Sequence, residues 1–183
     1  MKPWYLALVF VFASSFASAR ADVLVLVHGY LGTANSWVES GVMSRLQQRG
    51  FILAGVYSYH ASGVVLNPAP GKASAKPVYS VNLPSQAPIA LQADWLAAYL
   101  RDLRQRYPEQ SITVAAHSAG GVVARMTLVR HGALGVEHLV TIASPHLGTG
   151  RAVQALQATD NSGMFGFLRG WAVRRATGDA MYA

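Results

Sequence analysis

The stretch from residue 111 to residue 123 places the tightest constraint on how this chain folds. It opens with an apolar, β-branched run over 112–116, breaks at small residues, and continues in a helix-like pattern. A strand, a sharp turn and a helix, with Ser118 at the apex, predict a nucleophile elbow. In that geometry the serine hydroxyl stands clear of the sheet edge. The backbone N–H of Ala119 then faces the place where an oxyanion would form.

Small residues surround Ser118 because the strand and helix backbones nearly touch at such a turn. The motif is Ala116-His117-Ser118-Ala119-Gly120, with alanine at the position where glycine is usual. An ordinary loop of small residues could have the same five-residue pattern. The buried-type strand before the serine and the amphipathic pattern after it favour the elbow.

Composition narrows the functional classes. The chain has 183 residues, enough for one domain with a core, and it is 52% apolar and 13% charged, which excludes a disordered chain. Because there is no cysteine, neither disulfides nor a thiolate metal site can form. The net charge of +7 forms no basic stripe with aromatic residues, so we expect no nucleic-acid partner. The charge is compatible with contact to an anionic membrane surface.

The first residues have the form of a secretory signal peptide. Lys2 supplies a positive start, an apolar run covers 6–16, and Ala17-Ser18-Ala19 is a small-residue cleavage site. We expect residues 1–21 to be removed and the mature protein to be secreted or periplasmic. The alternative is an N-terminal membrane anchor, although the run is about half of the ~20 residues that span a bilayer.

The rest of the chain alternates between strand and helix patterns, in the order β-α-β-α-β-α-β. This order predicts an α/β domain with a mostly parallel sheet, helices on both faces and right-handed crossovers. The expected strands are 23–27, 51–59, 112–116 and 137–143, and the expected helices begin at 36, 85 and 120.

Local signals define the ends of these helices. A capping-box pattern at Ser36 and Glu39 predicts the first helix, with Gly50 as its C-terminal cap. Ser85 is expected to cap the second helix, which runs to 107. The third is expected to bury Val129 among other apolar residues. The proline-containing stretch 60–88 is interpreted as a long loop that either lines a cleft or is a tolerated insertion.

Three motifs follow expected strands directly. They are His28-Gly29-Tyr30, His117-Ser118 and Ser144-Pro145-His146. Ligands of parallel sheets bind beyond the carboxyl ends of the strands, so we expect the three motifs to converge there.

With these motifs the chain resembles the α/β-hydrolase superfamily, and more narrowly the bacterial secreted lipases and esterases. The resemblance covers 23–149. It implies that Ser118 is the nucleophile toward an ester carbonyl and that the N–H groups of Tyr30 and Ala119 form the oxyanion hole. It also implies supporting rather than catalytic roles, for His28, Gly29, His117, Gly120 and His146.

The resemblance further implies a catalytic acid and then a histidine after the serine, on later strands. After Thr149 the sequence has Asp160 and Asp179 but no histidine, and no further strand-like run. His131 and His138 precede the position that the family order requires. We therefore expect residues 22–183 to be the N-terminal part of a longer hydrolase.

The expected sheet is accordingly truncated after the equivalent of the sixth strand, with an exposed apolar edge. The acid and base are expected beyond Ala183, so this chain alone would lack both. Residues 150–183 would form either a lid or a surface that packs against the missing part.

The expected activity is hydrolysis of small-molecule or lipid carboxylic esters through an acyl-serine intermediate. Acyl transfer, thioester cleavage and amide cleavage on the same fold remain open, as does a binding scaffold without catalysis. Serine-based acyl transfer needs neither a cofactor nor a metal ion.

Overall fold

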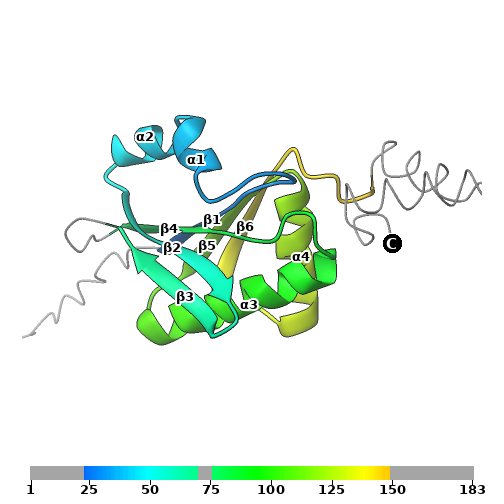
Figure 1. Ribbon diagram of the computed structural model, residues 1–183. Helices are drawn as coiled ribbons and strands as arrows, with labels where there is room; N and C mark the ends of the chain where they lie inside the picture. The colour runs from blue at the N-terminus through cyan, green and yellow to red at the C-terminus, as the bar shows by residue number, and fades with distance from the viewer. Residues whose placement is uncertain (1–22, 70–75, 149–183) are drawn as a thin grey trace, which may run out of the picture.

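The computed structural model describes residues 23–69 and 76–148 (Figure 1). The predicted signal peptide and the predicted lid segment lie outside the described residues. A six-stranded sheet has the order β3-β2-β4-β1-β5-β6. Only the β2–β3 pair is antiparallel, so the sheet is mostly parallel, as predicted.

The elements follow one another with short connections. The strands are β1 Val23–Val27, β2 Ile52–His60, β3 Gly63–Pro68, β4 Pro77–Val81, β5 Ile112–His117 and β6 Val136–Ile142. The helices are α1 Ser36–Glu39, α2 Val42–Gln47, α3 Ile89–Arg106 and α4 Ala119–His131. None of the helices in the described segments has the length and apolar character needed to cross a bilayer.

Strand β1 lies inside the sheet and is buried on both faces. Leu24 and Leu26 pack with Trp37 and Met43 of the short helices α1 and α2. The alternate residues of β1 face the other layer, where α3 and α4 pack against the sheet (Figure 1). A continuous Val/Leu run is what a parallel strand covered on both sides requires. The prediction of helices on both faces is confirmed.

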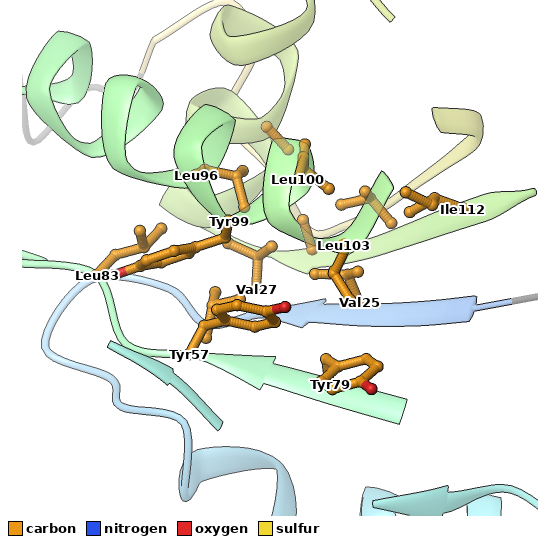
Figure 2. Close-up of a cluster of buried hydrophobic side chains, with 14 of the residues drawn as sticks. Val25, Val27, Tyr57, Tyr79, Leu83, Leu96, Tyr99, Leu100, Leu103 and Ile112 are labelled. Atoms are coloured by element: carbon orange, nitrogen blue, oxygen red, sulfur yellow. The ribbon is translucent and has the colours of Figure 1, made fainter. Parts of the chain in front are cut away.

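The larger core lies between the sheet and α3 (Figure 2). Leu96, Leu100 and Leu103 form the buried stripe of α3 and are at most 1% exposed. Tyr57 of β2 stacks on Tyr99 of α3 with ring centroids 5.3 Å apart. The aromatic contact joins a strand on one side of the sheet's centre to the helix that covers it.

The interpretation of 60–88 as one long loop is wrong, and the predicted order of elements is wrong with it. The stretch contains β3 and β4, and β4 lies between β1 and β2 in the sheet. Two of the prolines in this stretch stand at strand ends: Pro68 closes the edge strand β3 and Pro77 opens β4. At these positions a proline removes no essential ladder hydrogen bond.

The predicted first helix is two short helices. Gly41 has φ +76° and separates α1 from α2. The capping box at Ser36 is also wrong, because Ser36 is the first helical residue and its hydroxyl accepts the N–H of Thr33 at 3.0 Å. The C-cap of α2 is Gln48, and the predicted Gly50 follows two residues later in the left-handed conformation that ends the helical turn. The φ of Gly50 is +82°, and its N–H donates to the Gln47 carbonyl at 2.9 Å.

Two further details differ from the predictions. Helix α3 begins at Ile89, not at Ser85, because Pro88 occupies the N-cap position. Val129 is 78% exposed on α4, so the predicted burial of its side chain is wrong. Val140 and Ile142 of β6 are about half exposed. Within the described residues β6 pairs only with β5, so the predicted apolar edge is present there.

The central position of Leu100 gives a test of the core. Leu100→Ala should lower the free energy of unfolding by about 2–5 kcal/mol, because it removes a packed side chain and leaves a cavity. Urea unfolding followed by circular dichroism measures the change. Val129→Ala, at the exposed face of α4, is the matched control and should change stability by less than about 0.5 kcal/mol. Equal losses in both variants would contradict this description of the core.

Candidate active site

Ser118 occupies a strained turn between β5 and α4. Its backbone has φ 52° and ψ −128°, a region that residues with a side chain rarely adopt. Such strain typically costs about 1–3 kcal/mol and persists only where surrounding contacts enforce it. Here the N–H of Ser118 donates to the carbonyl of Ile142 at 2.8 Å, and its own carbonyl accepts the N–H of Gly121 at 3.0 Å.

The loop after β1 lies directly against this turn. A Cβ atom added at Gly29 would come within 2.9 Å of the Ser118 Cβ and 3.1 Å of the His117 carbonyl oxygen. A Cβ added at Gly120 would overlap the carbonyl oxygen of His28. Glycine at both positions is therefore what lets the two backbones meet. The contact brings Tyr30, the next residue of the loop, to the same side as Ser118.

Two backbone N–H groups lie beside the serine. Among the described residues, no hydrogen bond is formed by the N–H of Tyr30 or by that of Ala119. Ala119 is the first residue of α4, where the helix dipole favours negative charge. The Tyr30 turn is closed by the N–H of Gly32, which donates to the Gly29 carbonyl at 3.0 Å. These two groups could donate to an oxyanion.

His28 holds the loop in place with both ring nitrogens. Its Nε2 accepts the N–H of Leu83 at 3.0 Å, so Nδ1 carries the hydrogen and donates to the Gly29 carbonyl at 2.9 Å. Burial lowers the pKa of this imidazole, against the smaller opposite effect of the bond to Gly29. A neutral ring with both nitrogens engaged braces the loop and is unsuited to exchange protons with Ser118.

The end of β4 supplies anchors that the sequence analysis missed. The Asn82 side chain accepts the N–H of Ala34 at 2.8 Å and donates to the Ser58 hydroxyl at 3.1 Å. The buried Ser80 hydroxyl donates to the Ala34 carbonyl at 2.9 Å. A signal was present, because Val78, Tyr79 and Val81 are strand formers that lie just before Asn82. The prolines around them led to the loop interpretation.

A cleft of about 440 Å³ opens over Ser118. Its walls come from the loop after β1, from α1 and the start of α2, and from the ends of β5 and β6. The lining residues are His28, Gly29, Tyr30, Leu31, Gly32, Ser36, Trp37, Ser40, Val42, His117, Ser118 and Ile142.

Two of the three motifs at the strand ends converge on this cleft as expected. Ser144-Pro145-His146 does not line it, and Ile142 represents β6 there. A Cβ added at Gly121 would overlap the hydroxyl of Ser144, so this motif packs against α4. The His146 ring bonds the Thr141 hydroxyl at 3.2 Å.

In the described part of the chain no hydrogen bond involves the Ser118 hydroxyl, so no histidine there engages it as a base. His131 contacts Asp94 at 2.8 Å, but it stands at the far end of α4, about 18 Å along the helix axis from the elbow. His138 is exposed near the start of β6. Residues 23–69 and 76–148 also contain no cluster of three His, Asp or Glu residues that could hold a metal ion.

Comparisons with known proteins agree with this architecture. The sequence profile of a family described as alpha/beta hydrolase fold matches residues 22–176. A gene product of Listeria innocua is similar in structure, with a TM-score of 0.59 and 22% identity. The mature lipase BlEst2 of Bacillus licheniformis has a TM-score of 0.55 at 18% identity. Phospholipase PlaB of Legionella pneumophila has a TM-score of 0.50 at 16% identity. No match to this chain is found among the curated proteins.

The similarity covers different shares of each chain. It extends over 78% of this chain and 56% of the Listeria protein, and over 88% and 61% for the Bacillus lipase. For the Legionella phospholipase the shares are 80% and 30%. The chain thus spans less than two thirds of the length of these proteins. At these identities the likeness shows the fold alone.

The buried imidazole predicts a pH dependence of stability. Because the pKa of His28 is lower in the folded state than its usual 6.5, the unfolded chain binds protons more readily. This contribution to stability is present above pH 6.5 and is lost as the pH falls from there toward the folded pKa. His28→Gln keeps an acceptor for the Leu83 N–H and cannot titrate.

Urea unfolding between about pH 8 and about pH 5 should therefore show a smaller loss of stability in His28→Gln than in the original protein. The change in unfolding free energy with pH is measured within each protein. A loss of stability that is the same at every pH in the variant therefore does not affect the comparison. Equal slopes in the two proteins would contradict the assignment.

Proposed function

The chain belongs to the α/β-hydrolase fold family, and on that premise we propose that the full-length protein hydrolyses carboxylic esters through an acyl-serine intermediate. The observation that carries the proposal is the strained turn at Ser118, with φ 52°, which lines a cleft. Beside it are the N–H groups of Tyr30 and Ala119, which form no hydrogen bond within the described residues. Strain at a nucleophilic side chain that lines a cleft is typical of a functional site.

In the proposed reaction the Ser118 oxygen attacks the ester carbonyl carbon while a base takes the hydroxyl proton. Negative charge develops on the carbonyl oxygen, which accepts hydrogen bonds from the N–H groups of Tyr30 and Ala119. Each such donor typically lowers the barrier by about 2.7–4 kcal/mol. The intermediate collapses, the C–O bond to the alcohol breaks, and the base returns its proton to the leaving oxygen. Water then cleaves the acyl-serine by the same steps.

The reaction requires a histidine base and a carboxylate that orients it. His28 and His117 are assigned supporting roles, with Gly29 and Gly120 as the positions of close backbone contact. Because no histidine follows His146 in the sequence, we assign the base and the acid to a part of the full-length protein outside the described residues. The fold's Ser-acid-His order supports this assignment.

We propose that the substrate is a small-molecule or lipid ester and that the protein acts outside the cytoplasm. The signal-peptide pattern in residues 1–21 supports export, and the net charge of +7 favours contact with anionic membrane surfaces. A lipase and a phospholipase among proteins of similar fold are compatible with a lipid substrate. Cleavage of thioesters, cleavage of amides and acyl transfer to another alcohol would proceed through the same intermediate. Assays with a panel of esters, thioesters and amides distinguish these reactions.

A binding scaffold without catalysis is the second candidate. It is favoured by the lack of any hydrogen-bonded base at the Ser118 hydroxyl within the described residues. A scaffold would bind ester-like ligands in the cleft without turnover and without covalent labelling.

Labelling with a fluorophosphonate separates the two candidates. The full-length protein should be labelled at Ser118, and Ser118→Ala should lose both the label and about 10⁶-fold in ester hydrolysis, because the nucleophile is gone. Ser44→Ala, at an exposed position of α2, is the matched control and should keep both. Mass spectrometry of the labelled peptide and an ester assay give the readouts. A folded, unlabelled protein that binds esters would support the scaffold instead.

A further inference from the structure

Asn82 stands immediately after β4, and each of its polar groups has a hydrogen-bond partner. Its backbone N–H donates to the Tyr57 carbonyl at 2.8 Å, and its backbone carbonyl accepts the Tyr99 hydroxyl at 2.9 Å. Its side-chain oxygen accepts the N–H of Ala34 at 2.8 Å, and its side-chain N–H donates to the Ser58 hydroxyl at 3.1 Å. Asn82 therefore joins β2, α3 and the loop after β1 at one point. Because it does not line the cleft, it can affect catalysis only through the residues that it holds.

The loop after β1 is held at two points from the end of β4. At the start of the loop, the His28 ring accepts the N–H of Leu83 at 3.0 Å. Further along the loop, the Asn82 side chain accepts the N–H of Ala34 at 2.8 Å. Tyr30, whose N–H is a proposed oxyanion donor, lies between these two points. Within the described residues that N–H forms no hydrogen bond that would fix it, so its position depends on how the loop is held on either side.

Hydrogen-bond chemistry limits which side chains can hold the loop from position 82. The N–H of Ala34 can only donate, so its partner must present an acceptor. Aspartate has the shape of asparagine and keeps an oxygen at this place, whereas leucine has a similar size but no acceptor. The Ser58 hydroxyl can donate as well as accept, so it can also bond an aspartate. Aspartate therefore preserves both side-chain contacts of Asn82, and leucine removes both.

We propose that Asn82 is a positioning residue, which sets the place of the Tyr30 N–H in the oxyanion hole by holding Ala34. This inference rests on the proposed ester hydrolysis at Ser118 and adds a residue outside the cleft that governs its rate. Without the bond to Ala34, the loop shifts and the Tyr30 N–H leaves the place where negative charge develops. Because that charge is present only in the transition state, the shift lowers kcat and leaves KM nearly unchanged. Tyr99 acts on the same point, since its hydroxyl holds the Asn82 carbonyl.

The first test compares Asn82→Leu with Asn82→Asp in the full-length protein, with p-nitrophenyl butyrate as the substrate. Asn82→Leu should lower kcat by about 10- to 100-fold and keep KM within about twofold, because one oxyanion donor is displaced. Asn82→Asp should keep kcat within about threefold of the original value. The rate at which a fluorophosphonate labels Ser118, measured per folded molecule, should fall in parallel with kcat. A residue that only stabilised the fold would leave both rates unchanged in the folded molecules.

Two tyrosine variants form a matched pair that does not depend on the folding of Asn82→Leu. Tyr99→Phe removes the hydroxyl that holds the Asn82 carbonyl. Tyr79→Phe removes a hydroxyl from the same core, but this hydroxyl bonds that of Tyr107 at 2.8 Å and does not reach the loop. Both variants should lose a similar amount of stability in urea. Only Tyr99→Phe should lower kcat, by about threefold or more.

The outcomes separate this inference from the proposed function. If the original protein is labelled at Ser118 and hydrolyses the ester, an unchanged kcat in folded Asn82→Leu would overturn this inference alone. An equal loss of kcat in Asn82→Leu and Asn82→Asp would also overturn it. If circular dichroism shows that Asn82→Leu does not fold, an unchanged kcat in Tyr99→Phe would have the same consequence. Absence of both labelling and hydrolysis in the original protein would overturn the proposed function and this inference together.

Discussion

The contact between two backbones, with no side chain between them, is the constraint on which the candidate site depends. The loop after β1 touches the turn after β5 at Gly29 and at Gly120, and a single methyl group at either position would force the segments apart. Separation would move the N–H of Tyr30 away from that of Ala119. The arrangement of the candidate site therefore depends on glycine at these two positions.

The same loop is supported from a second direction by β4. His28 is joined to Leu83, and Ala34 to Asn82 and Ser80, by bonds of 2.8 to 3.0 Å. Asn82 is itself held by the Tyr99 hydroxyl, which donates to its carbonyl at 2.9 Å. The core of α3 and the candidate oxyanion loop are therefore linked through one strand end. A change in the packing of Tyr99 would be transmitted to the loop along this path.

The sequence predicts most of this architecture because its strongest signals are local. The strand predicted at 23–27, the helix predicted to run to 107 and the strand-turn-helix pattern at Ser118 depend on near neighbours, and the structure has each of them. The strands β3 and β4 were missed because Pro68 and Pro77 are read as loop residues unless the sheet position is known. Val129 was misplaced because α4 is apolar on more than one face, so periodicity could not decide which side is buried.

Part of the candidate site could likewise be predicted from the sequence, and part could not. The turn at Ser118 and the approach of Tyr30 follow from motif and strand order. The roles of Asn82 and Ser80 depend on the position of β4 in the sheet, between β1 and β2. No local sequence pattern specifies that position. His28 was expected to brace the loop from family resemblance, and its two hydrogen bonds supply a physical basis for that role.

The place of β1 in the sheet has a consequence for how the chain reaches its native state. This strand comes first in the described sequence, yet its partners come much later, with Leu24 beside Val78 and Val23 beside Ile112. Pairings so distant in sequence require the closure of large loops, which slows folding. On a ribosome, this apolar strand would lie without a neighbouring strand until β4 had been made, and without its second neighbour until β5 had been made. Through that interval it would be a natural binding site for a chaperone.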